Sequence, residues 1–431
     1  MKTLQYPRYK DSENEWMGKI PDGWHVKKLK HISNVRISNV DKKSRENEPA
    51  VSLCNYLHVY KNEFITAKMN FMKATATEEQ IRKLSLHRND VLITKDSEEP
   101  DDIAVPALVT EDLKGVVCGY HLALITPNSD VITGDYLFRS LQSKKINDQF
   151  IVEANGVTRF GISTYPILNS FFILPSISEQ KQIAHFLNAQ TSRIDKAIKT
   201  DENLIELLKE KRISLINYLV TKGLNPETEL KNSGIEWIGK MPIGWETKKL
   251  KYVADLKSGK NITSEQIDNE GAYPVYGGNG LRGFFSNYTH NGNFILIGRQ
   301  GALCGNINYA NGKFWASEHA VVVTLEKGNN IIYVGEVLRT MNLNRYSQSA
   351  AQPGLAVEEI AALHIPVPPY EEQNKIAEYI SVQTSKIDET VKKIQERIGL
   401  LNEFRKSLIS SAVTGKIDVR KQNGLGSKIF S

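Results

Sequence analysis

The chain is poor in residues that build covalent or metal-based cross-links. Its 431 residues include three cysteines, Cys54, Cys118 and Cys304, and no two of them form a C-x-x-C pair. This scarcity argues against a disulfide framework and a structural zinc site, and it is typical of a protein in a reducing cytoplasm. The nine histidines form neither an H-x-x-x-H nor an H-E-x-x-H set, so a catalytic zinc site is not indicated.

Long apolar runs are missing as well. No stretch of 18 apolar residues occurs, so the sequence predicts no membrane span. The N-terminal segment MKTLQYPRYK lacks the apolar centre of a signal peptide, and we expect a cytoplasmic protein. The hydrophobic content of 40% and charged content of 24% are ordinary for a globular protein. The net charge of +6 permits an anionic partner but does not require one.

What the sequence does contain is an internal repeat. Residues 12–30 read SENEWMGKIPDGWHVKKLK and residues 233–251 read SGIEWIGKMPIGWETKKLK, at an offset of 221. A second pair, EQKQIAHFLNAQTSRID at 179–195 and EQNKIAEYISVQTSKID at 372–388, matches at an offset of 193. The halves begin alike and end alike, but their centres do not resemble each other, and the first is 28 residues longer, the difference between the two offsets. This pattern favours one scaffold that presents two different readers.

Heptad patterns after the second motifs predict two long helices. Residues 178–221 contain neither proline nor glycine. A 4-3 spacing from Leu187 to Leu219 finds apolar residues at seven of ten positions, and the same spacing from Ile380 to Ala412 finds them at eight of ten. Both series place threonine second and arginine eighth. Such a seam predicts a coiled coil of two helices, each about 65 Å long, that pack most simply in antiparallel.

The predicted helices carry start and stop signals. A capping box of Ser176 and Glu179 opens the first helix, and a pair of prolines opens the second. Gly223 and Gly415 follow the helix ends as C-terminal stops. If a pseudo-twofold axis relates the two halves, the tail at residues 415–420 should lie near the N-terminus.

The two variable regions, residues 24–172 and 245–364, read as strands separated by turns. Strand-like runs are VLIT (91–94), GVVCGYHLALI (115–125), FFIL (171–174), YPVYGGNGLRG (273–283), NFILIGRQGALCGN (293–306) and FWASEHAVVVTL (314–325). The acidic stretch at 96–102 is predicted to be an exposed loop. We therefore expect an α+β protein with mostly antiparallel or mixed sheets, in which two globular domains are separated by two long antiparallel coiled-coil helices.

Three enzyme motifs occur only in incomplete form. Residues 367–370, VPPY, resemble the N/D-P-P-Y/F loop of amino-methyltransferases, but valine cannot accept a hydrogen bond from the target amine. The glycine-rich stretches at 276–280 and 298–305 do not open a helix in a βαβ unit, so they indicate tight turns. Asp101 with the later D-L-K at 112–114 mimics the PD-(D/E)xK nuclease pattern, which also occurs by chance. None of these is a complete active site.

The repeated motifs and three segments of the second variable region carry a family resemblance. The doubled W-x-G-K-x-P-x-G-W frame, the doubled EQ-x-x-IA starts with their Q-T-S-x-I-D continuations, and YPVYGGNGLRG, ILIGRQGA and FWASEHA resemble the specificity subunit of a type I restriction-modification system. The resemblance covers nearly the whole chain. It implies two target recognition domains, each reading one half of a bipartite, asymmetric double-stranded DNA site, and helices that set the gap between the halves.

The resemblance also implies partners and their cofactors. Two modification subunits, which are adenine methyltransferases, would dock on the chain, joined by restriction (nuclease and translocase) subunits where DNA is cleaved. S-adenosylmethionine, ATP and magnesium would be bound by those partners, and the chain itself would bind no cofactor and catalyse nothing. The predicted divisions are 1–174 (first target recognition domain), 175–222 (first spacer helix), 223–365 (linker and second target recognition domain), 366–415 (second spacer helix) and 416–431 (C-terminal tail).

Candidate DNA contacts follow from major-groove chemistry, in which arginine recognises guanine and asparagine or glutamine recognises adenine. In the first domain the candidates are Lys95, Tyr120, His121 and Arg159, and in the second Tyr276, Asn279, Arg282, Arg299, Gln300 and His319. The lysines at 27, 28, 30, 248, 249 and 251 suit phosphate contacts or a strand edge. The tryptophans at 16, 24, 237 and 245 occur in both halves, so we expect structural anchors rather than base-stacking groups.

Two other functions stay open at this point. One is an independent DNA methyltransferase or nuclease, and the other is a coiled-coil adaptor without sequence specificity. The unlike centres within alike frames favour the specificity subunit, because a simple spacer has no reason to vary there.

Overall fold

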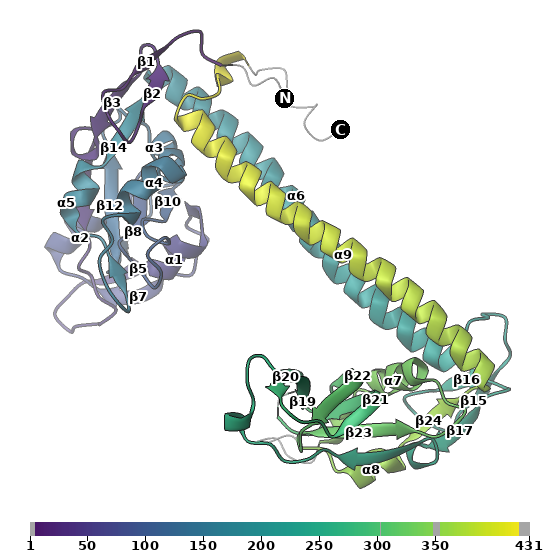
Figure 1. The fold of residues 1–431 in the computed structure, drawn as a ribbon. Helices are drawn as coiled ribbons and strands as arrows, with labels where there is room; N and C mark the ends of the chain where they lie inside the picture. The colour runs from purple at the N-terminus through teal and green to yellow at the C-terminus, as the bar shows by residue number, and fades with distance from the viewer. Residues whose placement is uncertain (1–4, 302, 348–353, 422–431) are drawn as a thin grey trace. The chain divides into compact units, whose positions relative to one another are not determined.

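The computed structural model describes residues 5–301, 303–347 and 354–421, and the chain divides into two units. Unit 1 combines Met1–Thr200 with Glu396–Ser431, and unit 2 is Asp201–Gln395. Each unit holds one globular domain together with part of both long helices, α6 (Ile177–Lys222) and α9 (Tyr370–Val413) (Figure 1). Residue 302 of the predicted glycine turn and residues 422–431 of the predicted tail lie outside the described residues.

The long helices have the predicted seam. All ten positions in each helix are buried or half-buried. In unit 1, Ile183 and Leu187 near the start of α6 share a core with Ile409 and Val413 near the end of α9. Unit 2 has the converse arrangement, with Ile216 and Leu219 sharing a core with Ile376 and Ile380. The helices are therefore antiparallel, as predicted, and their apolar faces complete the core of each domain.

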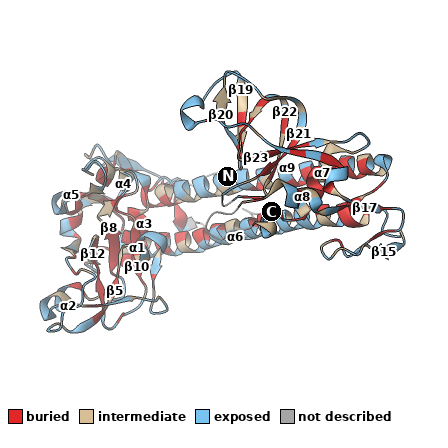
Figure 2. Ribbon diagram, turned by 90° about the horizontal axis from the view of Figure 1, so that it is seen from below, coloured by how far each residue is buried: buried red, intermediate tan, exposed pale blue. Residues whose placement is uncertain are grey.

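Domain 1 is the globular part of unit 1. Its strands are β1 (Tyr9–Asp11), β2 (Lys19–Pro21), β3 (His25–Lys28), β4 (Ser33–Ile37), β5 (Ala50–Cys54), β6 (Phe64–Ile65), β7 (Met72–Thr75), β8 (Val91–Thr94), β9 (Asp96–Ser97), β10 (Pro106–Val109), β11 (Val116–Cys118), β12 (Leu122–Pro127), β13 (Phe160–Gly161) and β14 (Phe171–Leu174). Its helices are α1 (Tyr56–Lys61), α2 (Glu78–Leu84), α3 (Gly134–Leu141), α4 (Lys144–Ile151) and α5 (Thr164–Asn169). A five-stranded sheet, β4-β12-β8-β10-β6, lies at its centre, and its strands β8 and β10 and most of β12 are buried (Figure 2).

Domain 2 is the globular part of unit 2. Its strands are β15 (Leu230–Asn232), β16 (Lys240–Pro242), β17 (Glu246–Lys249), β18 (Ala254–Ser258), β19 (Tyr273–Gly277), β20 (Gly280–Phe285), β21 (His290–Gly298), β22 (Ile307–Ala316), β23 (Ala320–Leu325) and β24 (His364–Val367), and its helices are α7 (Ile331–Thr340) and α8 (Val357–Ala362). A six-stranded sheet in the order β18-β23-β21-β22-β19-β20 forms its centre.

The two domains share a sheet topology that their sequences do not reveal. The order β4-β12-β8-β10-β6 corresponds to β18-β23-β21-β22-β19. In each series the first four strands are antiparallel and the fifth pairs in parallel with the fourth. The sheets are thus mixed, as predicted. In both domains a helix, α3 or α7, follows the second strand of the series and covers the sheet (Figure 1).

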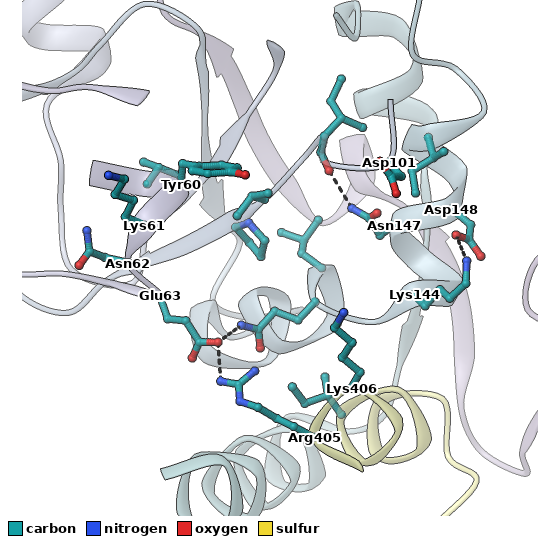
Figure 3. A pocket seen from close by; sticks show the side chains of 18 residues that line it. Tyr60, Lys61, Asn62, Glu63, Asp101, Lys144, Asn147, Asp148, Arg405 and Lys406 are labelled. Atoms are coloured by element: carbon teal, nitrogen blue, oxygen red, sulfur yellow. Dashed lines mark hydrogen bonds and ion pairs between the residues drawn. The ribbon is translucent and has the colours of Figure 1, made fainter. Parts of the chain in front are cut away.

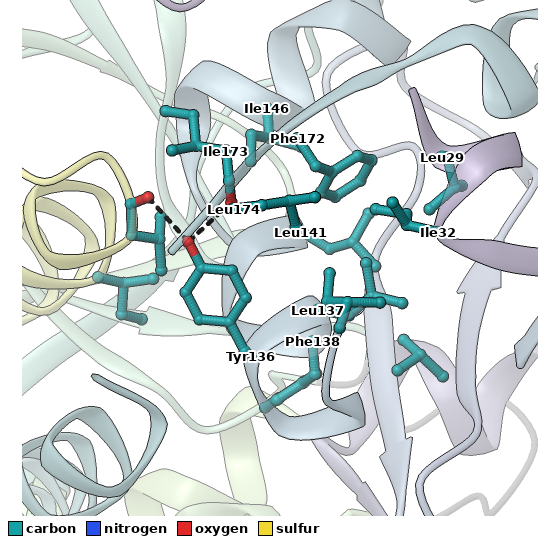
Figure 4. Close-up of a cluster of buried hydrophobic side chains, with 14 of the residues drawn as sticks. Leu29, Ile32, Tyr136, Leu137, Phe138, Leu141, Ile146, Phe172, Ile173 and Leu174 are labelled. Atoms are coloured by element: carbon teal, nitrogen blue, oxygen red, sulfur yellow. Dashed lines mark hydrogen bonds between the residues drawn. The ribbon is translucent and has the colours of Figure 1, made fainter. Parts of the chain in front are cut away.

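A buried tyrosine ties each domain to the end of a long helix. The Tyr136 hydroxyl lies 2.9 Å from the Ile173 carbonyl and 3.2 Å from that of Val413, the last residue of α9 (Figure 4). In unit 2 the Tyr333 hydroxyl lies 3.1 Å from the Pro366 carbonyl and 3.2 Å from that of Val220 in the last turn of α6. Carbonyls at a helix end have no partner within the helix, so these hydroxyls satisfy them. Burial raises the pKa of both tyrosines, which stay protonated donors.

The repeated EQ motif fixes the start of each long helix. Gln180 accepts a hydrogen bond from the Thr133 amide at 2.9 Å and donates to the Pro175 carbonyl at 3.1 Å. Gln373 makes the corresponding bonds to Asn330 at 2.9 Å and to Pro368 at 3.0 Å. The glutamines are 0% and 1% exposed, so these bonds replace water for otherwise buried polar groups.

The repeated Q-T-S-x-I-D motif pairs with the arginine of the opposite seam. Arg405 Nε lies 2.8 Å from Asp195 Oδ1 in unit 1, and Arg212 Nε lies 3.3 Å from Asp388 Oδ1 in unit 2. Asp195 and Arg212 belong to α6, whereas Asp388 and Arg405 belong to α9, so each ion pair joins the two helices. The motif therefore recurs because the same interhelical ion pair is made twice.

Glycines end both long helices, as predicted. Gly223 and Gly415 have φ values of +78° and +72°, in the left-handed region that other residues avoid. A Cβ atom on Gly415 would lie 2.4 Å from Pro21, and one on Gly223 would lie 3.2 Å from Trp245. Each helix end thus packs closely on the P-x-G-W part of the repeated frame.

The C-terminal tail lies beside the N-terminal strand, as predicted. Tyr9 donates to the Gly415 carbonyl at 2.9 Å, and the Arg420 guanidinium lies 4.7 Å from the centre of the Tyr6 ring. Only half of the predicted capping box forms. Ser176 accepts from the Glu179 amide at 3.3 Å, but the Glu179 carboxylate binds the side chains of Tyr6 and Trp24 instead of returning to Ser176.

The prediction of an exposed acidic loop at 96–102 is wrong at its start. Ser97 is only 2% exposed, and β9 pairs with β13 through Ser97 and Phe160. Asp96 is half-buried because its carboxylate binds the Lys95 and His121 side chains. Among the described helices, none combines the length and apolar character needed to cross a membrane.

We expect Tyr136→Phe to lower the stability of unit 1. The substitution leaves the buried Ile173 and Val413 carbonyls without their donor, at a cost of about 1–3 kcal/mol. Urea unfolding of the purified chain measures this change. Tyr165→Phe is the control, because Tyr165 is 74% exposed. Equal midpoints for the two variants would contradict the proposed role of the hydroxyl.

Candidate nucleic-acid interface

Three loops meet at one edge of the central sheet in each domain. In domain 1 these are the residues after β8, those before β12, and the segment that contains Gly161 and Ile162. In domain 2 they are the residues after β21, those before β23, and the segment that starts with Gly354 and Leu355. The antiparallel pairing of Thr94 with Leu122, and of Gly298 with Ala320, places the first two loops side by side. We call this the loop edge of each domain.

A cation and a histidine occupy equivalent backbone positions on the two loop edges. The Lys95 amide donates to the His121 carbonyl at 2.9 Å, and the Arg299 amide donates to the His319 carbonyl at 2.9 Å. The carbonyls of Lys95 and Arg299 each accept from the third loop, whose donors are the amides of Ile162 and Leu355, both at 2.9 Å.

The next residue differs between the domains. Asp96 pairs with Gly161, and Gln300 pairs in the same way with Gly354. The loop edges therefore share a backbone frame, but they carry different hydrogen-bonding groups at the position after the cation.

All four candidates of domain 1 lie together. Asp96 Oδ2 lies 3.0 Å from Lys95 Nζ and 2.5 Å from His121 Nδ1, so one carboxylate orients both. The Tyr120 ring centre is 4.0 Å from that of His121 and 5.6 Å from Lys95 Nζ. Tyr120, His121 and Arg159 line a pocket of about 360 Å³. Tyr120 is 46% exposed and Arg159 is exposed, so both can reach a ligand.

His121 has a backbone conformation that is rare for its residue type. Its φ is +73°, in the left-handed region, and hydrogen bonds of the loop edge hold it there. Such conformations gather at functional sites, where the surrounding structure maintains them.

Glycines bring the loops of domain 2 together. A Cβ atom on Gly278 would lie 3.1 Å from the Gln300 carbonyl oxygen and 3.2 Å from that of His319. A Cβ atom on Gly298 would lie 2.1 Å from the Gly278 carbonyl oxygen. Only glycine permits this approach, which places Asn279 beside the loops of Arg299, Gln300 and His319.

The side chains of these candidates are largely accessible. Asn279, Arg282 and Gln300 are exposed, and the His319 side chain is 41% exposed. Arg299 donates to the Ser258 hydroxyl at 3.1 Å. Arg282 projects from β20, and its methylene groups lie over Gly277.

Tyr276 has a different environment. Its half-buried ring packs edge-on against the buried Phe314 ring, with 5.7 Å between the ring centres. The tyrosine therefore supports the sheet more than it faces outward.

Residues that sequence analysis missed complete the pocket of domain 1. Asn55 and Tyr56, at the start of α1, line it together with Lys42. Burial and the neighbouring Asp102 raise the pKa of Tyr56. No motif marks these residues, because long-range strand pairing brings them to the loop edge. The sequence did contain one local signal at this site, because Asn55 and His58 have the spacing of a capping box at the start of a helix.

The repeated lysines and tryptophans mostly have structural contacts. Lys28 lies in β3 with its amine 5.2 Å from the Phe171 ring centre, and Lys30 donates to Asn169 at 3.0 Å. Trp24 and Trp245 are 2% and 1% exposed and act as core anchors, as predicted. The other two differ from them, because Trp16 is 37% exposed and Trp237 is partly buried.

The nuclease-like carboxylates belong to no metal cluster within the part of the chain that the structure describes. Asp112, which is 72% exposed, accepts from the Arg88 amide at 3.1 Å. Asp101 lies on the wall of a different cavity, described below.

Comparison with known families gives one match in two copies. The family model for the type I restriction modification DNA specificity domain matches residues 21–209 and 242–399. These ranges take in both domains and most of both long helices.

Curated relatives carry matching names. A putative type I restriction enzyme specificity subunit, MjaX, from Methanocaldococcus jannaschii is 24% identical over 97% of this chain and 99% of the relative. The EcoprrI specificity subunit of Escherichia coli is 43% identical over 134 residues, which are 30% of this chain and 33% of that relative. The second match thus spans about a third of the relative's length.

Two solved structures share the fold. One, from work on complex assembly and conformational transition of the type I R-M system, has a TM-score of 0.72 at 15% identity and covers 91% of this chain and 98% of its own. The HsdS subunit from Thermoanaerobacter tengcongensis has a TM-score of 0.55 at 17% identity, with coverages of 92% and 98%. At such low identity the likeness establishes the fold alone.

We expect Gly298→Ala to disrupt the loop edge of domain 2. Its methyl group would collide with the Gly278 carbonyl, and overpacking of this kind costs about 1–3 kcal/mol. Gly244→Ala is the control, since a Cβ atom there meets nothing within 4 Å. Thermal unfolding of both variants measures the difference. A melting temperature for Gly298→Ala equal to that of the control would contradict the described packing.

Proposed function

Because the chain belongs to the family of type I restriction modification DNA specificity domains, we propose that it reads a bipartite, asymmetric DNA site, with one half-site for each domain. Domains 1 and 2 are then the two target recognition domains of a specificity subunit. The long helices separate the half-sites by a fixed number of unread base pairs.

One observation carries this proposal: the two loop edges share a backbone but differ in side chains. Lys95 and Arg299 occupy one position, and Asp96 and Gln300 occupy the next. The shared backbone holds the side chains of both loop edges at equivalent positions. Because these side chains carry different donors and acceptors, the two domains can select different bases. An adaptor without sequence specificity has no physical reason for this difference.

The chemistry of each loop edge suits base edges in the major groove. In domain 2, Arg299 and Arg282 offer paired donors for guanine, and Gln300 and Asn279 offer the donor and acceptor pair that adenine requires. His319 adds a further polar group. In domain 1, Lys95 and Arg159 are donors, and His121 adds a polar ring that Asp96 orients. Tyr120 presents an exposed ring for a thymine methyl or a base face.

The segments that repeat in the sequence are suited to bind two copies of a partner subunit. Both units present the same W-x-G-K-x-P-x-G-W frame packed against a helix end. We therefore propose that the chain docks two copies of an adenine methyltransferase subunit, and nuclease and translocase subunits where DNA is cleaved. S-adenosylmethionine, ATP and magnesium would then be bound by those partners, while this chain supplies recognition without catalysis.

Mapping of methyladenine at base resolution tests this function. Genomic DNA is compared from cells with and without the chain, with the modification partner present in both. We expect a gapped, two-part methylated motif that disappears when the chain is removed. An unchanged methylome would reject a reading role and favour the adaptor. Methylation by the purified chain alone, with S-adenosylmethionine and no partner, would instead support an independent enzyme.

We expect Arg299→Ala to relax one half-site and leave the other unchanged. Loss of a bidentate guanine contact costs about 1–3 kcal/mol of discrimination. Lys327→Ala is the control, because this exposed lysine follows β23 at the end away from the loop edge. Methylation of a library randomised at both half-sites measures the effect. Equal weakening on every sequence would identify Arg299 as a phosphate contact.

A further inference from the structure

Besides the contacts near the helix ends, such as those of Tyr136 and Gln180, domain 1 has an attachment that lies farther along the long helices. Its centre is Glu63, between α1 and β6. Glu63 Oε1 lies 2.6 Å from Arg405 Nη2 of α9 (Figure 3). Its Oε2 lies 3.3 Å from Arg139 Nη1 of α3. The glutamate thus joins an arginine of the domain to an arginine of the helix.

The two arginines extend this network to α6. Arg139 donates to Asn188 at 2.9 Å and to the seam residue Thr191 at 3.1 Å. Arg405 donates to Asp195 at 2.8 Å. The Arg139 side chain is 1% exposed, so its charge depends on these partners. The negative charges of Glu63 and Asp195 thus balance the positive charges of Arg139 and Arg405.

A cavity lies beside the network, so polar contacts rather than apolar packing join domain 1 to α9 at this place. About 560 Å³ of open space lies between α1, α4 and α9, and Glu63 and Arg405 meet at one end of it (Figure 3). Apolar packing of the domain on α9 is concentrated at Ile409, Ala412 and Val413, near the helix end. Arg405 precedes Val413 by eight residues, or about 12 Å along the helix. The Glu63 network is therefore a second point of attachment to α9, farther from the helix end than these apolar contacts.

Among the residues of unit 2 that the structure describes, the equivalent positions have other partners. Arg212 corresponds to Arg405 and pairs with Asp388 at 3.3 Å. If Tyr333 is aligned with Tyr136, Glu336 takes the place of Arg139. Glu336 binds Arg339 and Tyr309 within domain 2.

We propose that Glu63 is a positioning residue that fixes the orientation of the domain 1 loop edge on the helix pair, and so limits the complex to one gap length between half-sites. This inference rests on the proposed function. One additional base pair moves a half-site by about 3.4 Å along the DNA. A domain held at two fixed points resists that displacement, whereas a domain held at one can follow it.

The test uses the complex of the full chain with its modification partner. Its substrate is a DNA library in which the two mapped half-sites are separated by the natural gap, or by one or two base pairs more or fewer. Methyladenine is read at each gap. For Glu63→Gln we expect the preference for the natural gap to fall by about tenfold, equivalent to about 1.4 kcal/mol. Both half-site sequences should stay as in the original chain.

Two matched pairs make the result specific. Glu336→Gln is the same change at the position in domain 2 that corresponds to Arg139, and it should leave gap preference unchanged. Arg405→Lys weakens the bridge between Glu63 and Asp195, because Arg405 reaches them through two different nitrogens of its planar fork and a single ammonium nitrogen replaces both. It should widen the accepted gaps, while Arg212→Lys should not. This second pair also decides the matter if Glu63→Gln fails to fold.

Three outcomes would overturn the inference. One is a folded Glu63→Gln or Arg405→Lys complex with the original gap preference. Another is a changed first half-site at an unchanged gap, which would make Glu63 a support for base reading. The third is equal widening by the control variants, which would show a general loosening of the helix pair. Failure of the proposed function looks different, because the original chain would then direct no gapped methylation at all.

Discussion

The structure depends on a single constraint, the need to satisfy the carbonyls where a long helix ends inside a domain. Tyr136 meets it in unit 1 and Tyr333 in unit 2. A helix that ended in solvent would leave its carbonyls to water and would need no such partner. Here the helix end is part of the domain core, so a buried hydroxyl and a left-handed glycine are both required. The repeated frame and the EQ motif both surround these two junctions.

The same constraint accounts for the distribution of repeated and variable sequence. Residues at the two helix-end junctions must meet the same geometry twice, so they recur. Strands of the domains need only to be apolar and to pair in the right order, and many sequences meet that requirement. The loop edges have the least restriction on side chains, because their frame is set by backbone hydrogen bonds such as those of Lys95 and Arg299. Variation is therefore tolerated at the loop edges, where we propose that recognition takes place.

The sequence predicted the features that show a regular spacing of apolar residues or an internal repeat of a motif. The helices and their antiparallel seam follow from the regular spacing of apolar residues. So do some of the strands, β8, β11, β12 and β14 in domain 1 and β19 to β23 in domain 2, with help from glycine turns. The equivalence of Lys95 with Arg299, and of His121 with His319, was hidden because these pairs are offset by 204 and 198 residues, unlike the frame. The burial of Ser97 and the Glu63 network were also missed. Each arises from contact between segments distant in the sequence, for which a local pattern holds no information.

The sharing of both helices between the units has a consequence for how the protein is made. Ile409, Ala412 and Val413 complete the core of unit 1. The ribosome adds these three residues about 400 residues after it has made the first residues of that core. Unit 2, by contrast, is one continuous segment, Asp201–Gln395. On the ribosome, the second half of the protein can therefore finish folding first. The N-terminal domain must wait with an open apolar face until the end of α9 emerges, and during that interval it is a natural client for a chaperone.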